Sequence, residues 1–394
     1  MWLILFFAIG LADAESPAYV TQAKSIQEKC QKDTQRIYVR LEKEQESAAN
    51  ESERRSAEER AYSEIRQLRF DASKKVLELS APNASETAAV DLLVWAAIVP
   101  SEEARQPAVE LLATHHLTHE STIRFALRHH LLLSPAIESL LRAQLDAIDP
   151  TDAQHPKLLI ALAESMQSKA AAVARFQIAG PAELELYEKR ALSRSLIDQW
   201  KSLDSQRLQD DAVALFTRLE KEHGQKPIRE GSERTFADLA RSAIFEIQHL
   251  GIGKQAPEIE GKDLAGRPMK LSDFRGKVVM LTFWASWCGP CMALVPHEKE
   301  IVERYKDSPF ALIGINGDSE KAKAEEAIQK EGITWRSFAC GEKGPDGELP
   351  RSWNVSGWPT IYLIDSKGTI RAKDRYDAAL DEELEKLIKE AAGK

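Results

Sequence analysis

Residues 278–291 read VVMLTFWASWCGPC, an apolar run that passes through Ala-Ser-Trp into two cysteines separated by Gly-Pro. The run predicts a buried strand, and the residues that follow predict a helix starting at the cysteines. Cys288 would then lie at the N-terminus of that helix, where unpaired N–H groups and the helix dipole favour an anion. This placement lowers the pKa of a thiol, and a thiolate is the nucleophile of disulfide exchange. Cys291, one turn further on, could attack the mixed disulfide and release the product.

Two cysteines at this spacing are also half of a common zinc site. A zinc site needs a second pair of ligands, yet Cys30 and Cys340 are isolated in the sequence and His297 has no second ligand beside it. A purely structural disulfide is the other alternative. We expect a redox pair here, with neither a metal nor another cofactor.

From about residue 250 onward, short β-type runs alternate with helical stretches. Such alternation is typical of an α/β domain with a mainly parallel sheet. The predicted strands are Lys277–Thr282, Phe310–Ile315, Thr334–Phe338, Thr360–Ile364 and Thr369–Lys373, and the predicted helices are Met292–Tyr305, Ser319–Glu331 and Asp381–Ala392.

The sequence before this domain predicts helices only, so the fold is expected to be all-α followed by α/β. Residues 16–82 are highly charged with Ile and Leu at helical spacing, which predicts long solvated helices forming a hairpin that turns near Ala49-Asn50. Residues 83–250 predict shorter helices with brief connections, as in a small α-solenoid. These helices are Thr87–Val99, Glu103–Thr114, Ser121–Leu132, Ser134–Ala147, Pro156–Lys169, Ala182–Leu203, Ser205–His223 and Ser232–His249. The last domain is expected over 253–394.

Length, charge and cysteine content narrow the class of protein. A chain of 394 residues suggests two or three domains. The net charge of −9 argues against a nucleic-acid binder, which is usually basic. Four cysteines are too few for a disulfide-stapled scaffold.

The first residues of the chain indicate export. Residues 1–14 are mostly apolar and end in Ala12-Asp13-Ala14, the small-x-small pattern that signal peptidase reads. No Lys or Arg precedes the run, so an uncleaved membrane anchor is the alternative. We expect a signal peptide over 1–14 and a mature protein in the periplasm or cell envelope.

The octapeptide WASWCGPC at 284–291 resembles the active-site signature of the thioredoxin superfamily. The segments GKQAP at 253–257 and LSDFRGKVV at 271–279 are similar to the entry segment of its TlpA-like, redoxin branch, which occurs in bacterial envelopes. Pro296 matches the first helix of that branch, and GWPT at 357–360 matches the loop whose proline is cis in the family. The resemblance covers residues 253–392 and implies a thioredoxin fold, with the extra strand–helix unit of this branch at Glu320–Phe338.

The resemblance also implies roles for individual residues. Cys288 is the attacking thiol and Cys291 the resolving thiol of a thiol–disulfide oxidoreductase. The implied partners are a disulfide-containing protein substrate and an upstream thiol reductant, and the Gly-Pro dipeptide favours reduction over oxidation. The residues expected to contact the substrate are Trp287, Gly289, Pro290, Trp358 and Pro359.

Two positions depart from the family pattern. Thioredoxins carry a buried Asp on the strand before the active site, where this chain has Thr282. Several TlpA-like proteins carry a Glu three residues after the second cysteine, where this chain has Leu294. Those carboxylates assist proton transfer to or from the second thiol. Another group or water must therefore do so here, or the pair reacts more slowly or has a different reduction potential.

Four tryptophans lie near the motif in the sequence or in the implied fold. Trp284, Trp287, Trp353 and Trp358 could form an aromatic surround for the cysteines. Trp284 is expected in the core, whereas Trp287 and Trp358 are expected to face a partner because their loops flank the cysteines.

The other cysteines and a group of histidines are weaker candidates. We expect Cys340 to be an inert buried thiol, with a third redox thiol as the alternative. Cys30 is expected to be a bystander, with an intermolecular disulfide as the alternative. The histidines could hold a metal but lack a second-ligand pattern, and they are His115, His116, His119, His129 and His130.

Two other functions stay open. The redoxin entry segment is shared with peroxiredoxins, but their peroxidatic Cys is usually preceded by Thr three residues earlier, where this chain has Ala285. A thiol peroxidase is therefore the less favoured alternative. The helical residues 17–250 could instead be a docking module that binds a partner and positions the redox domain.

Overall fold

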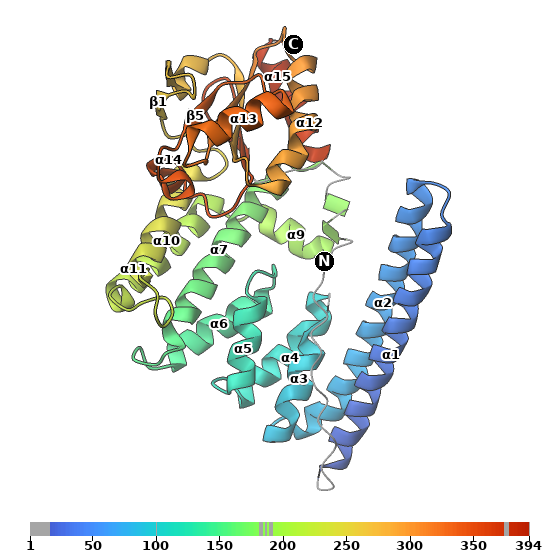
Figure 1. The fold of residues 1–394 in the computed structure, drawn as a ribbon. Helices are drawn as coiled ribbons and strands as arrows, with labels where there is room; N and C mark the ends of the chain where they lie inside the picture. Colours follow the sequence, from blue (N-terminus) through green and yellow to red (C-terminus); the bar gives the residue numbers. More distant parts are fainter. Residues whose placement is uncertain are drawn as a thin grey trace. The chain divides into compact units, whose positions relative to one another are not determined.

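The computed structural model describes residues 16–99, 101–180, 184–185, 187–188, 192–373 and 378–393. The chain forms two compact units, divided between Ala237 and Asp238 (Figure 1). The signal peptide expected over residues 1–14 lies outside the described residues. Among the helices that are described, each is too short or too polar to span a membrane.

The first unit begins with the predicted helical hairpin, made of α1 (Ala18–Ser47) and α2 (Glu51–Ser80). The Asn50 side chain accepts a hydrogen bond from the Glu53 N–H, and the Glu53 carboxylate accepts one from the Ala49 N–H, both at 2.9 Å. This reciprocal cap starts α2 directly after the turn. The apolar side chains meet along the seam between the two helices: Ile37, Leu41, Ala57, Ala61 and Ile65.

Shorter helices follow, and α3 to α10 pack against near neighbours in the sequence, as the predicted solenoid requires. Short 3-10 turns at Ala81–Asn83 and Thr87–Ala89 lead into them. The helices are α3 (Val90–Ala97), α4 (Glu102–His115), α5 (Glu120–His129), α6 (Pro135–Ala147), α7 (His155–Ile178), α9 (Arg194–Lys201) and α10 (Ser205–His223). Helix α11 (Phe236–Phe245) begins at the end of this unit and continues, in the second unit, as a π-helical turn over Glu246–Leu250.

The prediction of one helix over Ala182–Leu203 is wrong. Ser193 is not helical, and its hydroxyl caps α9 by accepting a hydrogen bond from the Leu196 N–H at 3.3 Å. Serine competes for backbone N–H groups and so favours helix starts over helix interiors. Part of the predicted range, including Ala182, lies outside the described residues. Helix α7 instead runs to Ile178, beyond the predicted end at Lys169.

The second unit contains a five-stranded sheet in the order β5-β4-β3-β6-β7, together with a β1–β2 hairpin that the sequence patterns did not predict. Helices α12 and α13 follow β3 and β4 along the chain. The strands are β1 (Glu260–Lys262), β2 (Pro268–Lys270), β3 (Val278–Trp284), β4 (Phe310–Asn316), β5 (Ser337–Ala339), β6 (Thr360–Ile364) and β7 (Ile370–Lys373), and the helices are α12 (Gly289–Arg304), α13 (Lys321–Glu331), α14 (Glu348–Ser352) and α15 (Ala378–Ala391).

The expectation of a mainly parallel sheet is wrong, because the sheet is mixed. Strands β3, β4 and β5 are parallel to one another, whereas β6 is antiparallel to β3 and β7 is antiparallel to β6. Helical crossovers join the parallel strands, and the short segment 365–369 joins β6 to β7, which a parallel pair would not permit. Alternation of strands and helices in the sequence does not show this reversal.

Strand β3 is the centre of the second unit, and all seven of its residues are buried. Val279, Leu281 and Phe283 pack into a cluster on one face, and Val278 and Met280 pack into a cluster on the other. A strand covered on both faces explains why the sequence shows a continuous apolar run rather than alternation. The core therefore fixes the end of β3. The loop that follows, residues 285–288, is called the cysteine loop here.

Candidate active site

The two cysteines lie where the sequence predicts, between the end of β3 and the start of α12. Cys288 is the N-cap residue of α12, and its sulfur accepts a hydrogen bond from the Cys291 N–H at 3.2 Å. The two sulfurs form a disulfide with an S–S distance of 2.00 Å. Gly289 and Pro290 are the first two helical residues, where a missing proline N–H costs no hydrogen bond.

Two tryptophans flank this disulfide. The Trp287 side chain is 54% exposed, although Cys288 beside it is only 4% exposed. Its ring meets that of Trp358 edge-on, with centroids 5.7 Å apart. The Trp358–Pro359 peptide bond is cis, as the resemblance implies. Two aromatic rings thus lie beside the cysteine pair.

The other two tryptophans do not belong to that surface. Trp284 is buried, as predicted, and its indole N–H donates a hydrogen bond to the Ser337 hydroxyl at 3.2 Å. Trp353 is fully buried against Phe283 and Tyr362, so the suggestion that it surrounds the cysteines is wrong. Nothing in its local sequence distinguishes it from a loop tryptophan that faces solvent.

A buried aspartate that sequence reasoning missed holds the cysteine loop. Asp318 follows β4, and its carboxylate accepts hydrogen bonds from the Ser286 N–H (3.0 Å) and hydroxyl (2.6 Å). The side-chain amide of Asn316 donates a third hydrogen bond at 2.7 Å. The expected strand order indicates such a residue, because the carboxyl ends of adjacent parallel strands meet at one edge of a sheet. Asp318 thereby positions the residue two places before Cys288.

Replacing this aspartate is expected to destabilise the second unit. In Asp318→Asn one acceptor oxygen becomes an N–H₂ donor facing donors on Ser286 and Asn316. We expect the free energy of unfolding to fall by about 1–3 kcal/mol, measured by denaturant unfolding followed by tryptophan fluorescence. Asp307→Asn, at an exposed position, is the matched control and should change little. Equal stability of the two variants would contradict the positioning role.

Gly317 allows Trp358 to lie beside the loop. A Cβ atom at this position would stand 2.5 Å from the Trp358 ring. Gly317→Ala is therefore expected to displace the ring, change the near-ultraviolet circular dichroism and lower the free energy of unfolding by about 1–3 kcal/mol. Gly357→Ala is the control, because a Cβ there meets nothing within 4 Å. Identical aromatic spectra for Gly317→Ala and the unaltered chain would show that the ring tolerates the methyl group.

Comparison with known proteins gives this geometry a family. Residues 252–373 match the AhpC/TSA family. The chain is 33% identical over 132 residues to the thioredoxin-like protein YneN of Bacillus subtilis (strain 168), a match that covers 32% of this chain and 74% of that protein. It is 30% identical over 122 residues to the thiol-disulfide oxidoreductase ResA of Geobacillus kaustophilus (strain HTA426), covering 31% of this chain and 68% of that protein. The chain belongs to the thioredoxin-like thiol-disulfide oxidoreductases.

A third relative extends the match slightly. ResA of Bacillus thuringiensis subsp. konkukian (strain 97-27) is 29% identical over 151 residues, covering 38% of this chain and 84% of that protein. The matched part of this thioredoxin-like oxidoreductase contains the cysteine pair, the cysteine loop and all of the five-stranded sheet. Most of the chain, including the whole of the helical first unit, is outside the family match.

This thioredoxin-like oxidoreductase carries a buried carboxylate at a position other than 282 and 294, the two positions at which the family pattern has one. Glu298 on α12 is 4% exposed, and the Thr282 hydroxyl on β3 donates a hydrogen bond to it. Burial raises the pKa of Glu298 from 4.5 to about 7, against the smaller lowering effect of Thr282. A carboxylate is therefore present next to the residue that replaces the usual aspartate.

The signal for Glu298 was present in the sequence as helical spacing. The buried residues of α12 are Cys291, Val295, Glu298 and Ile301, which follow one another at intervals of four, three and three. Such intervals place side chains on one face of a helix. A glutamate within that apolar stripe departs from the rule that buried faces are apolar, and such departures concentrate at functional positions.

The remaining cysteines are free in this oxidoreductase. Cys340 is partly buried, and burial, with a smaller contribution from Asp318, raises the pKa of its thiol to about 12. Cys30 is buried on α1, and burial raises the pKa of its thiol as well. Both thiols are held in the protonated, weakly nucleophilic form at neutral pH.

The histidines noted in the helical unit do not surround a common point. His116 bonds to the Ala84 carbonyl oxygen at 2.6 Å, and His130 pairs with the Glu164 carboxylate at 2.7 Å. Burial lowers the pKa of His129 to about 4, so this ring is neutral at pH 7. These side chains have separate structural partners rather than a shared ligand.

A different group of side chains meets where the start of α7 lies beside the end of α10. Within the described part of the chain, His155, His223 and Glu222 are the set close enough to share a metal, with two ring nitrogens 2.9 Å apart. Arg218 and Lys226 each lie 3.3 Å from an outer ring nitrogen of this pair. A metal-bound imidazole donates its other N–H to an acceptor, so the two cations disfavour a metal there.

Proposed function

We propose that this chain reduces or exchanges disulfide bonds in other proteins through Cys288 and Cys291. The observation that carries the proposal is the Cys288–Cys291 disulfide at the start of α12, next to the exposed Trp287. In the reduced protein the helix N-terminus favours the Cys288 thiolate, which attacks a substrate sulfur and displaces one substrate thiolate. Cys291 then attacks Cys288, a disulfide forms between them, and the second substrate thiolate leaves. Two electrons pass from the dithiol to the substrate.

The surface around the disulfide supports a protein substrate. Gly289 and Pro290 are exposed, and a Cβ at Gly289 would meet nothing within 4 Å, so a chain could approach closely. Trp287 and Trp358 offer an apolar border, and Pro359 follows in its cis form. In this proposal the backbone of the Pro359 loop pairs with an extended segment of the substrate.

The proposed setting is the periplasm or cell envelope, with an upstream thiol reductant that restores the dithiol. The apolar residues 1–14 support export. The helical residues 17–250 are proposed to dock a partner, because they lie outside the family match and most of them belong to the first unit. No nucleic acid is involved in this proposal. Finding Met1 still attached to the protein recovered from cells would contradict cleavage of a signal peptide.

The test of the proposed activity uses the full-length reduced protein and a small protein with an accessible disulfide, such as insulin. We expect disulfide reduction by the unaltered chain and none above background by Cys288→Ser, because only Cys288 lies at the helix start. The reduction potential of the pair gives the direction of electron flow. A value near that of strong oxidants, about −120 mV, would contradict the reductase assignment.

The peroxidase alternative has its own test. The match to the AhpC/TSA family is the observation that favours a thiol peroxidase. Ala285, at the position where peroxiredoxins usually have threonine, disfavours this function. Cys291→Ser retains the Cys288 thiol and would suffice for peroxide reduction by a one-cysteine peroxidase. We expect no hydrogen peroxide turnover by this variant in the presence of excess dithiol.

A further inference from the structure

We infer that Glu298 accepts the proton of the Cys291 thiol and returns it in each redox cycle. The proton passes between them by way of the Thr282 hydroxyl or a water. The inference rests on the proposed function and adds a residue to it. Glu298 acts on the Cys291 thiol only through Thr282 or a water. It is therefore a positioning residue rather than a catalytic residue. Its place on α12 differs from the two positions at which this chain lacks the family carboxylate, Thr282 and Leu294.

The backbone places Glu298 on the same buried face of α12 as Cys291. The two residues are seven positions apart, about 10 Å along the helix axis, with Val295 between them on that face. Helical side chains lean toward the N-terminus of the helix, so the Glu298 carboxylate is directed back toward Cys291. Thr282, on the central strand that α12 covers, donates its hydroxyl hydrogen to that carboxylate.

No structural ion pair accounts for this buried carboxylate. Among the described residues, burial and the Thr282 hydrogen bond are the influences on its pKa, and no cation contributes. On α12, His297 pairs with Asp381 of α15 at 3.1 Å, and Lys299 bonds to the Glu331 carbonyl oxygen at 3.0 Å.

The charged groups of the neighbouring α15 are also engaged elsewhere. Glu383 lies 3.7 Å from Arg371 of β7 and 3.8 Å from Lys386. A buried carboxyl without a cation costs free energy. Its pKa of about 7 makes it half ionised near neutral pH, where a group exchanges protons most effectively.

The proton step follows the formation of the mixed disulfide on Cys288. The S–H bond of Cys291 breaks, and its proton passes by way of the Thr282 hydroxyl or an intervening water to the Glu298 carboxylate. The Cys291 thiolate then bonds to the Cys288 sulfur, and the substrate leaves as a thiolate. When an upstream dithiol reduces the Cys288–Cys291 disulfide, Glu298 returns the proton to Cys291.

The experiment separates the two thiol steps in the full-length reduced protein. Stopped-flow mixing with a symmetric aromatic disulfide releases one coloured thiol when Cys288 attacks and a second when Cys291 resolves the mixed disulfide. The rate of each phase is measured from pH 5 to pH 9. In the unaltered chain we expect the second phase to show an inflection near pH 7, the pKa of Glu298.

Glu298→Gln is expected to slow the second phase about ten- to a hundredfold at pH 7 and to remove the inflection. The first phase should change less than about twofold, because the helix N-terminus, not Glu298, favours the Cys288 thiolate. Thr282→Val is expected to slow the second phase as well. The double variant Thr282→Asp/Glu298→Gln returns a carboxyl group to this place from the strand side and should restore much of the lost rate.

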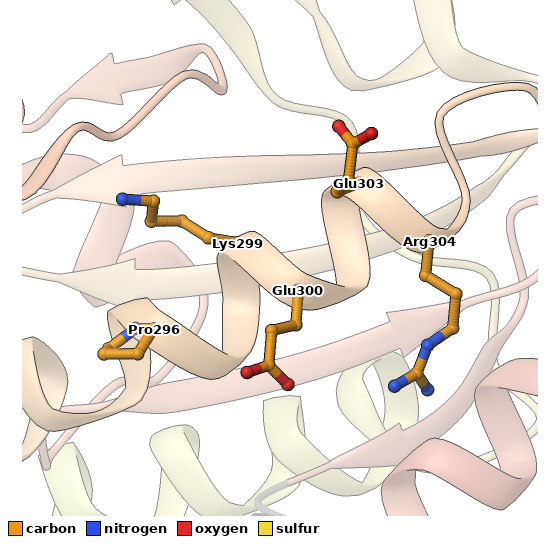
Figure 2. A pocket seen from close by; sticks show the side chains of 5 residues that line it. All are labelled: Pro296, Lys299, Glu300, Glu303 and Arg304. Carbon is orange, nitrogen blue, oxygen red and sulfur yellow. The ribbon is translucent and has the colours of Figure 1, made fainter.

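Glu300→Gln is the matched control, because Glu300 lies on the opposite, exposed face of α12. Figure 2 shows Glu300 on α12 with the other residues that line a shallow surface pocket there: Pro296, Lys299, Glu303 and Arg304. Equal slowing of both phases in Glu298→Gln, or an unchanged second phase and pH profile, would overturn the inference. Absence of the first phase in the unaltered chain would contradict the proposed function instead.

Discussion

Cys291→Ser is expected to accumulate a mixed disulfide between Cys288 and its protein substrate, and to lose multiple-turnover reduction. The Cys288 thiolate still forms at the start of α12, but no second thiol lies one turn further on to attack it. The trapped complex should appear on a non-reducing gel, disappear when dithiol is added, and yield the partner by mass spectrometry. Cys288→Ser should trap nothing, because Cys291 is only 3% exposed.

The free cysteines provide the matched controls for this experiment. Cys340→Ser and Cys30→Ser are expected to retain both turnover and the Cys288–Cys291 disulfide, because neither thiol is paired in the structure. Loss of the trapped complex in the double variant Cys291→Ser/Cys340→Ser would show that Cys340 contributes a third redox thiol. A complex that survives in Cys288→Ser/Cys291→Ser would contradict the assignment of Cys288 as the attacking thiol.

Glu298 is expected to make the stability of the oxidised second unit fall as pH rises from about 4.5 to about 7. In the folded chain its pKa is raised from 4.5 to about 7, so over this range the unfolded chain binds fewer protons than the folded chain. This rise in the pKa of Glu298 corresponds to about 3 kcal/mol. The contribution of Glu298 to the free energy of unfolding is greatest below pH 4.5, and it no longer changes with pH above about 7.

Glu298→Gln should remove this dependence, because an amide does not titrate. Denaturant unfolding of the oxidised protein at pH 5 and pH 8 would measure it, as a smaller difference between the two pH values in the variant than in the unaltered chain. Glu300→Gln, on the exposed face of α12, should keep the full difference (Figure 2). Parallel pH profiles for the unaltered chain and Glu298→Gln would show that Glu298 titrates near its ordinary pKa.

Local pattern predicted the elements that local forces dominate. The turn near Ala49-Asn50 was predicted correctly because Asn50 caps the following helix through its own side chain. The strand before the cysteines was predicted because a strand buried on both faces is uniformly apolar. The single helix expected over Ala182–Leu203 failed at Ser193, where a local hydrogen bond outweighed the helical spacing of the apolar residues.

The sequence by itself determined where the disulfide pair lies, because both cysteines and the helix start lie within four consecutive residues, Cys288 to Cys291. Tertiary structure alone decided which side chains support the pair. Asp318 reaches Ser286 across adjacent strands, and Glu298 reaches Thr282 across the helix–sheet interface. Such contacts join residues distant in the sequence, and their geometry depends on strand order and on which face of α12 is buried, neither of which a motif specifies.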